Sequence, residues 1–319
     1  MEPFVKHILT PLALTLIAAP ALAQDKMTVM LDWFINPDHG PIILAEENGY
    51  FTDAGLEVEL ISPADPNDPP RMVAAGRVDL AVSYQPELHL AQREGLDLRR
   101  VGTLVETPLT CLVVRADGPV KEMADLKGRK VGFAVSGVQE MLLDAMLSHH
   151  GVAPSEVEQI NIGWSISPAL MSGQVDGVIG AFRNFELNQM QIEGHEGRCF
   201  YPEAEGVPAY DELIYVAHAE DMDREMIARF LRATERAAAD IVNDPAASGE
   251  TFFASDAELR NELNTRAWED TWPRFATRPA AVDHGRYDRF EAFMQESGVV
   301  ETVIPAADLV VDVTAQAKP

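Results

Sequence analysis

Short β-like runs alternate with helical runs along most of the chain, and this rhythm restricts the fold more than any other feature. The first β-like runs are Met27–Leu31, Leu56–Ile61 and Val78–Ser83. Between them, one helical run begins at Pro41 and another covers Arg71–Ala75, and each is followed by a glycine that can end it. Strands separated by helices in this way commonly pair in parallel. The pattern therefore predicts an α/β protein with helices layered on a mostly parallel sheet.

A second unit of the same kind begins near residue 107. Its predicted strands include Leu109–Val114, Lys130–Val135 and Val175–Ile179, and Glu212–Ala217 is strand-like again. The remaining sequence is mostly helical, with runs predicted at Arg224–Asn243, Ala257–Thr271 and Arg286–Glu296.

These two units predict two lobes that are joined by two chain crossings. We expect lobe I to comprise residues 24–107 plus 212–319, and lobe II to comprise residues 108–211. A hinged pair of lobes encloses a small ligand between the loops at the carboxyl ends of its strands. Periodicity alone leaves a single-lobe α/β enzyme open.

Residues 1–23 have the composition of a secretory signal peptide. Lys6 and His7 precede an apolar run from Ile8 to Ala19, and Ala21-Leu22-Ala23 supplies a small-residue cleavage pattern. The run is shorter than the roughly 20 apolar residues of a membrane span. We therefore expect cleavage near Ala23 and export of a soluble, monomeric protein to the periplasm.

Charge and cysteine content exclude several classes of function. The chain has 51 acidic and 25 basic side chains, giving a net charge of −26, which opposes binding to nucleic acid. The only cysteines, Cys111 and Cys199, could form a disulfide or remain two buried thiols. No histidine or cysteine spacing indicates a metal site, so we predict none.

Several segments resemble a known family. They are LDWFINPDH at 31–39, AEENGYF at 45–51, VDLAVSYQPE at 78–87, GAFRNFE at 180–186 and GVPAYDEL at 206–213. Together they are similar to the thiamine-pyrimidine-precursor binding proteins of ABC importers, which are related to a fungal pyrimidine synthase. The resemblance implies a type II periplasmic-binding-protein-like fold, with two α/β lobes, a two-segment hinge and a ligand cleft between the lobes. It also implies an ABC transporter permease as partner, no cofactor, and formylaminopyrimidine or hydroxymethyl-aminopyrimidine as ligand.

Aromatic and polar side chains in these segments suit such a ligand. Trp33 and Tyr84 follow predicted strands and can stack on a flat ring. Glu186, with Asn184, can hold the amino edge of an aminopyrimidine. Without the family resemblance, the aromatic residues would more often be core or rim residues, and Glu186 a solvated acid. The other predicted ligand-binding residues are Asp32, Asn36, His39, Ser83, Ser136 and Gly137.

Two of these interpretations compete with local structural roles. The backbone N–H groups of Ser136 and Gly137 can receive a formyl oxygen, but Ser136 can equally cap the following helix. Asp38 precedes a helix that begins with proline, so we expect it to cap that helix rather than contact the ligand.

Other functions remain open at this point. The same scaffold can bind an alkanesulfonate, nitrate or a riboflavin-like ring, and Arg183 keeps an oxyanion ligand possible. A pyrimidine-converting enzyme could use Glu186 or His39 as a base. The fungal synthases hold pyridoxal phosphate through a lysine and carry a cysteine-rich motif, whereas VSYQ at 82–85 has no lysine and the chain has no cysteine cluster. We therefore predict a binding protein and no enzymatic activity.

Overall fold

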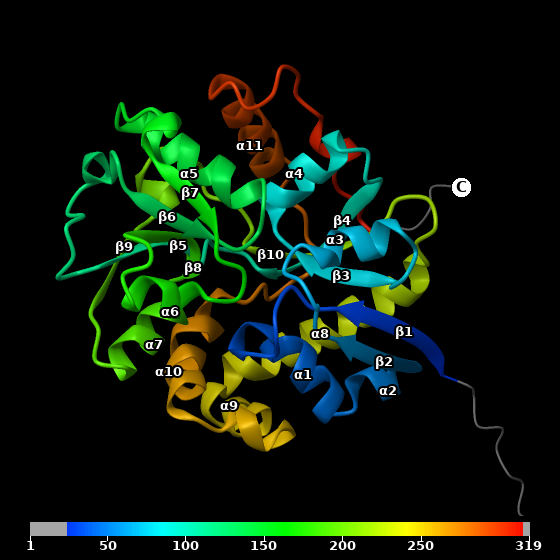
Figure 1. Cartoon of the computed structure of the whole chain (residues 1–319). Helices are drawn as coiled ribbons and strands as arrows, with labels where there is room; N and C mark the ends of the chain where they lie inside the picture. The colour runs from blue at the N-terminus through cyan, green and yellow to red at the C-terminus, as the bar shows by residue number, and fades with distance from the viewer. Residues whose placement is uncertain (1–23, 315–319) are drawn as a thin grey trace, which may run out of the picture.

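The computed structural model describes residues 24–314 and contains two five-stranded sheets (Figure 1). The predicted signal peptide, residues 1–23, lies outside the described residues. The first sheet has the order β2-β1-β3-β10-β4, in which β1, β2 and β3 are parallel and β10 is antiparallel to its neighbours. Its strands are β1 (Asp25–Met30), β2 (Leu56–Ile61), β3 (Leu80–Ser83), β4 (Leu98–Val105) and β10 (Leu213–His218).

The second sheet repeats this arrangement with the order β7-β6-β8-β5-β9. Strands β6, β7 and β8 are parallel, and β5 is antiparallel to β8 and to β9. The strands of this sheet are β5 (Thr110–Arg115), β6 (Lys130–Phe133), β7 (Glu158–Asn161), β8 (Gly177–Phe182) and β9 (Gly197–Phe200).

The chain passes between the sheets twice, from β4 to β5 and from β9 to β10. The predicted two-lobe α/β fold is therefore confirmed. The lobe boundaries at residues 107 and 211 remain predictions. We use lobe I for the part built on the first sheet and lobe II for the part built on the second.

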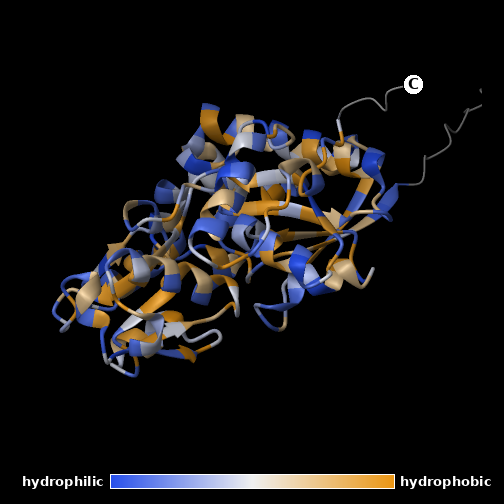
Figure 2. Cartoon of the chain, turned by 90° about the horizontal axis from the view of Figure 1, so that it is seen from above, coloured by the Kyte–Doolittle hydropathy of each residue, from blue (hydrophilic) through white to orange (hydrophobic). Residues whose placement is uncertain are grey.

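Helices cover both sheets, and the apolar side chains of the strands form the core between them. Strand β3 is buried along its whole length, and Figure 2 shows the strands largely in hydrophobic colours and the peripheral loops mostly in hydrophilic ones.

No helix within residues 24–314 is long and apolar enough to cross a membrane. The α-helices of lobe I are α1 (Gly40–Glu47), α2 (Tyr50–Asp53), α3 (Asp68–Ala74), α4 (Gln85–Arg93), α8 (Arg224–Asn243), α9 (Pro245–Ser255), α10 (Glu262–Thr271) and α11 (His284–Glu296), and those of lobe II are α5 (Val138–His149), α6 (Ile166–Met171) and α7 (Glu186–Ile192).

The two chain crossings are fastened to each other by Glu212, at the start of β10. Its buried carboxylate accepts hydrogen bonds from the backbone N–H groups of Leu109 and Thr110, at 2.5 and 2.8 Å. The Thr110 hydroxyl donates a third bond at 2.8 Å. One side chain therefore holds the beginning of β5 against the beginning of β10, where the lobes join.

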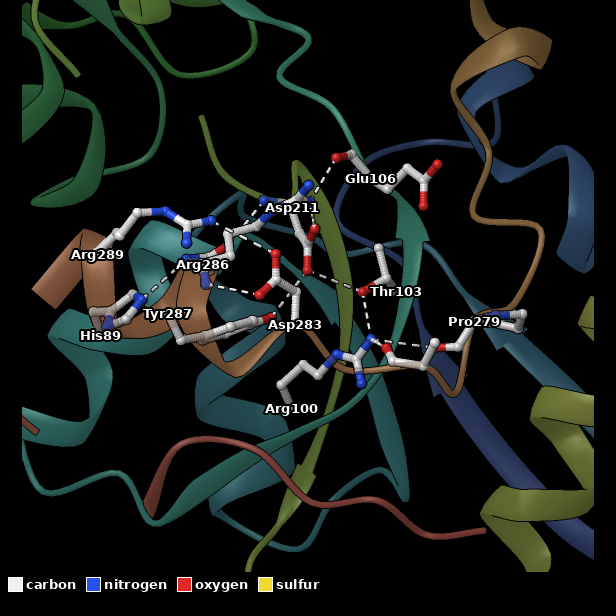
Figure 3. Close-up of polar contacts among 12 residues, drawn as sticks. His89, Arg100, Thr103, Glu106, Asp211, Pro279, Asp283, Arg286, Tyr287 and Arg289 are labelled. Carbon is white, nitrogen blue, oxygen red and sulfur yellow. Dashed lines mark hydrogen bonds and ion pairs between the residues drawn. The ribbon is translucent and has the colours of Figure 1, made fainter. Parts of the chain in front are cut away.

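The neighbouring Asp211 ties the same junction to helix α11 (Figure 3). It accepts hydrogen bonds from Thr103 at 3.1 Å and from Tyr287 at 3.2 Å, and it forms an ion pair with Arg286. Thr103 in turn accepts a bond from the buried Arg100 at 2.6 Å. The C-terminal helix is thus anchored where the lobes meet.

Cys111 and Cys199 form a disulfide, which settles the alternative that the sequence leaves open. The residues lie on the adjacent strands β5 and β9, and their Cα atoms are 5.6 Å apart. The bond links the edge strand of lobe II to the strand that enters the lobe from the hinge.

Candidate functional site

A small cavity lies between the lobes. Lobe I supplies part of its wall from the loops that follow β1 and β3. These strands are parallel neighbours, so their carboxyl ends open at the same edge of the sheet. The lining residues from this lobe are Asp32, Trp33, Asn36, Asp38 and Tyr84.

Lobe II supplies the opposite wall from β8 and from helices α5, α6 and α7. The lining residues from this lobe are Gln139, Ile166, Gly180, Phe182, Phe185 and Glu186. The cavity therefore has polar and aromatic walls on both sides, as expected for a site that closes around a ligand.

Asp32 organises the lobe I wall. It is buried and accepts hydrogen bonds from the Tyr84 hydroxyl and from His39 Nε2, both at 2.9 Å. The backbone N–H of Asn36 donates to His39 Nδ1 at 3.3 Å, so the ring proton lies on Nε2 and points to Asp32. His39 is fully buried behind the wall, where it positions Asp32 and does not line the cavity.

Asn36 caps the short helix that follows it, and Asp38 does not, contrary to the prediction from sequence. The Asn36 side-chain oxygen accepts the Asp38 N–H at 2.8 Å. The carboxylate of Asp38 instead lines the cavity and accepts a hydrogen bond from Asn184 Nδ2 at 2.6 Å. Asn184 also donates to Thr271 at 2.6 Å, so it bridges the lobes and does not itself line the cavity.

Glu186 faces Asp38 from the lobe II wall, at the first position of α7. Its Oε2 accepts the Phe182 N–H at 2.6 Å. Burial, with a smaller contribution from the negative charge of Asp38, raises the pKa of Glu186 to about 8, although the hydrogen bond from Phe182 lowers it. Burial also raises the pKa of Asp38 to about 6. Of this facing pair, Glu186 therefore keeps its proton to a higher pH than Asp38 does.

Aromatic rings meet across the cavity. The ring centroids of Trp33, from lobe I, and Trp164, from lobe II, are 4.1 Å apart and inclined at 57°. Tyr84 and Phe182 make an edge-to-face contact with centroids 6.4 Å apart. These contacts hold the lobes together and place two rings, Trp33 and Tyr84, in the wall of the cavity.

The remaining predicted residues lie outside this cavity. Ser83 is buried behind it and donates to Glu87 at 2.7 Å. Ser136 and Gly137 line a separate pocket, where their backbone N–H groups donate to Asn67 at 2.8 Å and to Glu140 at 2.7 Å. The structure therefore does not bring Ser83, Ser136 or Gly137 into the cavity.

Gln139 and Gly180 form a part of the wall that the sequence does not predict. Gln139 accepts the N–H groups of Ala134 and Val135, at 2.7 and 3.1 Å, which fixes its side chain. Gly180 has φ of +87°, and a Cβ atom there would lie 2.1 Å from Gln139 Nε2. Glycine at position 180 is thus required both by the backbone and by the Gln139 side chain.

The ionisable carboxyl side chains in the cavity wall are acidic ones, Asp32, Asp38 and Glu186. Within the described chain, the residues that line the cavity include no lysine, arginine or histidine. Residues 24–314 also contain no group of three or more His, Cys, Asp or Glu side chains that could hold a metal ion. The arrangement can stack a flat ring and accept hydrogen bonds from its N–H groups, and it offers no counter-charge to an oxyanion.

The buried carboxyl groups predict a stability that depends on pH. Burial raises the folded pKa values of Asp38, Glu87, Glu186 and Glu212 to about 6, 7, 8 and 7, above their unfolded values of 3.8, 4.5, 4.5 and 4.5. The folded state therefore keeps protons that the unfolded chain has released. We expect the free energy of unfolding to fall by several kcal/mol between about pH 5 and pH 8.

Urea unfolding of the ligand-free protein across this pH range measures that fall. Glu186→Gln removes one of these four titrations, so its curve is expected to be flatter than that of the wild type. A free energy of unfolding that rises from pH 5 to pH 8 would contradict these assignments.

Known proteins that are similar in sequence have names that refer to thiamine or to its pyrimidine part. The NMT1/THI5 like family model matches residues 36–248. The chain is 46% identical to a thiamine biosynthesis protein of Haemophilus influenzae, over 93% of this chain and 95% of the relative. It is 34% identical to the formylaminopyrimidine-binding protein of Halalkalibacterium halodurans, over 70% of this chain and 68% of the relative. It is 27% identical to the 4-amino-5-hydroxymethyl-2-methylpyrimidine phosphate synthase of Schizosaccharomyces pombe, over 80% of this chain and 77% of the relative.

A solved structure shows the same fold at low sequence identity. The periplasmic aliphatic sulphonate binding protein SsuA of Escherichia coli superimposes with a TM-score of 0.71 and 17% identity, over 92% of this chain and 94% of that one. The architecture is therefore that of periplasmic solute-binding proteins.

Proposed function

The chain belongs to the NMT1/THI5-like family, and on that premise we propose that it captures a thiamine pyrimidine precursor for an ABC importer. The ligand is formylaminopyrimidine or hydroxymethyl-aminopyrimidine. One observation carries the proposal: both lobes wall a single cavity that has acidic groups and aromatic rings but, among its described lining residues, no basic side chain.

Each wall has a defined role in this proposal. The pyrimidine ring stacks on Trp33 and Tyr84, which both line the cavity. Its amino group and adjacent ring nitrogen face Glu186, and Asp32 holds the Tyr84 ring in place. Contacts to both lobes favour the closed state, which the permease then recognises in the periplasm. No bond of the ligand is broken.

A ligand panel tests the proposal. The two pyrimidines are expected to raise the melting temperature of the purified protein, because a ligand at 100 times its Kd adds about 2.7 kcal/mol to stability. An aliphatic sulfonate, nitrate and riboflavin are expected to leave it unchanged. Mass spectrometry of the co-purifying ligand identifies the pyrimidine directly, and stabilisation by a sulfonate alone would overturn the proposal.

Pyrimidine synthesis is the alternative that the names of some relatives raise. The described lining residues of the cavity include no lysine to hold an aldehyde cofactor. Recovery of the added pyrimidine unaltered after prolonged incubation supports transport, whereas its conversion would favour an enzyme.

A further inference from the structure

A second and larger hollow, lined by residues of both lobes, adjoins the cavity. The two spaces share four lining residues, Trp33, Ile166, Phe185 and Glu186. A ligand that fills the cavity therefore has a route into this outer groove along the faces of Trp33 and Phe185.

Exposed aromatic rings wall the outer groove on both lobes. Phe34 is 46% exposed and Trp164 is 41% exposed, although both are large apolar side chains. Their ring centroids lie 6.4 Å apart, and Phe34 also lies 6.3 Å from Phe185. Aromatic faces left open to solvent in a rimmed groove are typical of a binding surface.

The charged groups of the groove are all acidic. Asp256 and Glu258 line it from the lobe I side, and both are exposed. Glu258 forms no ion pair with any residue in the range 24–314 that the structure describes. Among the described lining residues there is no lysine, arginine or histidine. Open aromatic faces beside unpaired carboxylates suit an organic cation.

We infer that the outer groove binds a second, cationic aromatic ring carried by a pyrimidine whose first ring occupies the cavity. The inference rests on the proposed function, because it needs the pyrimidine to lie against Trp33 and Glu186. The ligands of the protein then include two-ring pyrimidine cations, of which thiamine is an available probe. The second ring lies on the exposed faces of Phe34 and Trp164, and the carboxylates of Asp256 and Glu258 balance its positive charge.

Titration calorimetry with thiamine and with hydroxymethyl-aminopyrimidine tests the inference on the full mature chain. Asp256→Asn/Glu258→Gln is expected to weaken thiamine binding about three- to tenfold and to leave the single-ring affinity within about twofold. Raising the salt from about 0.02 to 0.5 M is expected to weaken thiamine binding only. Glu193→Gln/Glu269→Gln removes the same charge from exposed sites outside the groove and is expected to change neither affinity.

Measurements with both ligands distinguish a failure of this inference from a failure of the proposed function. Binding of the single-ring pyrimidine without binding of thiamine would overturn this inference and leave the proposed function standing. Equal weakening of both ligands by Asp256→Asn/Glu258→Gln would also overturn it. Binding of neither ligand would refute the proposed function, and the inference would fall with it.

Discussion

Replacing Glu186 by glutamine is expected to weaken binding of the aminopyrimidine by about 1–3 kcal/mol, the cost of leaving a buried hydrogen-bonding group without its partner. One carboxyl oxygen of Glu186 already accepts the Phe182 N–H. A glutamine that keeps this bond through its oxygen presents only N–H donors to the cavity. Those donors oppose the amino N–H of the ligand, whereas the free oxygen of a carboxyl group can accept it.

Isothermal titration calorimetry measures this loss, and Glu193→Gln is a matched control. Glu193 follows the same helix α7, is exposed and does not line the cavity, so the same substitution there is expected to leave the affinity unchanged. A Glu186→Gln protein with native circular dichroism and wild-type affinity would refute the role assigned to Glu186.

Removal of the Cys111–Cys199 disulfide is expected to lower the free energy of unfolding by about 4 kcal/mol. The bond joins residues that are 88 positions apart and so closes a loop that contains most of lobe II. In the chain-entropy model, a cross-link over a loop of this length restricts the unfolded chain strongly. Urea unfolding of the Cys111→Ala/Cys199→Ala double variant measures the loss.

A reducing agent supplies the control for this substitution. It is expected to lower the unfolding midpoint of the wild type to that of the double variant, and to leave the double variant unchanged. A wild-type midpoint that does not respond to the reductant would show that the bond contributes nothing to stability.

Elements with a strong local signal are predictable from the sequence. Helix α8 runs from Arg224 to Asn243, as predicted, because Asp223 caps its first turn and its apolar residues recur at helical spacing. Helix α3 begins at Asp68, three residues before the predicted start at Arg71, because prolines at the first positions of a helix are tolerated.

Elements that depend on distant partners are not predictable in this way. Strand β4 carries Arg100, which suggests an exposed segment, yet the side chain is 1% exposed and donates to the carbonyl groups of Pro279 and Ala281. Strand β9 is a short edge strand that is paired with β5 and bonded to it through Cys199. Helices α4, α7 and α9 are also missing from the sequence prediction.

The residues of the candidate site also fall into a predictable group and a group that depends on distant partners. Asp32, Trp33, Asn36, Tyr84 and Glu186 lie in recognisable segments, and the structure places all of them in the cavity wall. The roles of Asp38 and Asn184 arise only when the lobes meet and Asn184 donates across the interface. Phe182 and Phe185 have the pattern of core residues, and only the closed fold shows that they face a cavity.

Strand β10 also fixes the order in which the chain can fold. It lies at the inside of the first sheet, between β3 and β4, but it follows every strand of the second sheet in the sequence. The second sheet can therefore assemble from one continuous segment, while β3 and β4 keep open edges that can pair wrongly. Pairings between distant segments form slowly, so we expect this six-residue strand to pair with β3 and β4 late in folding.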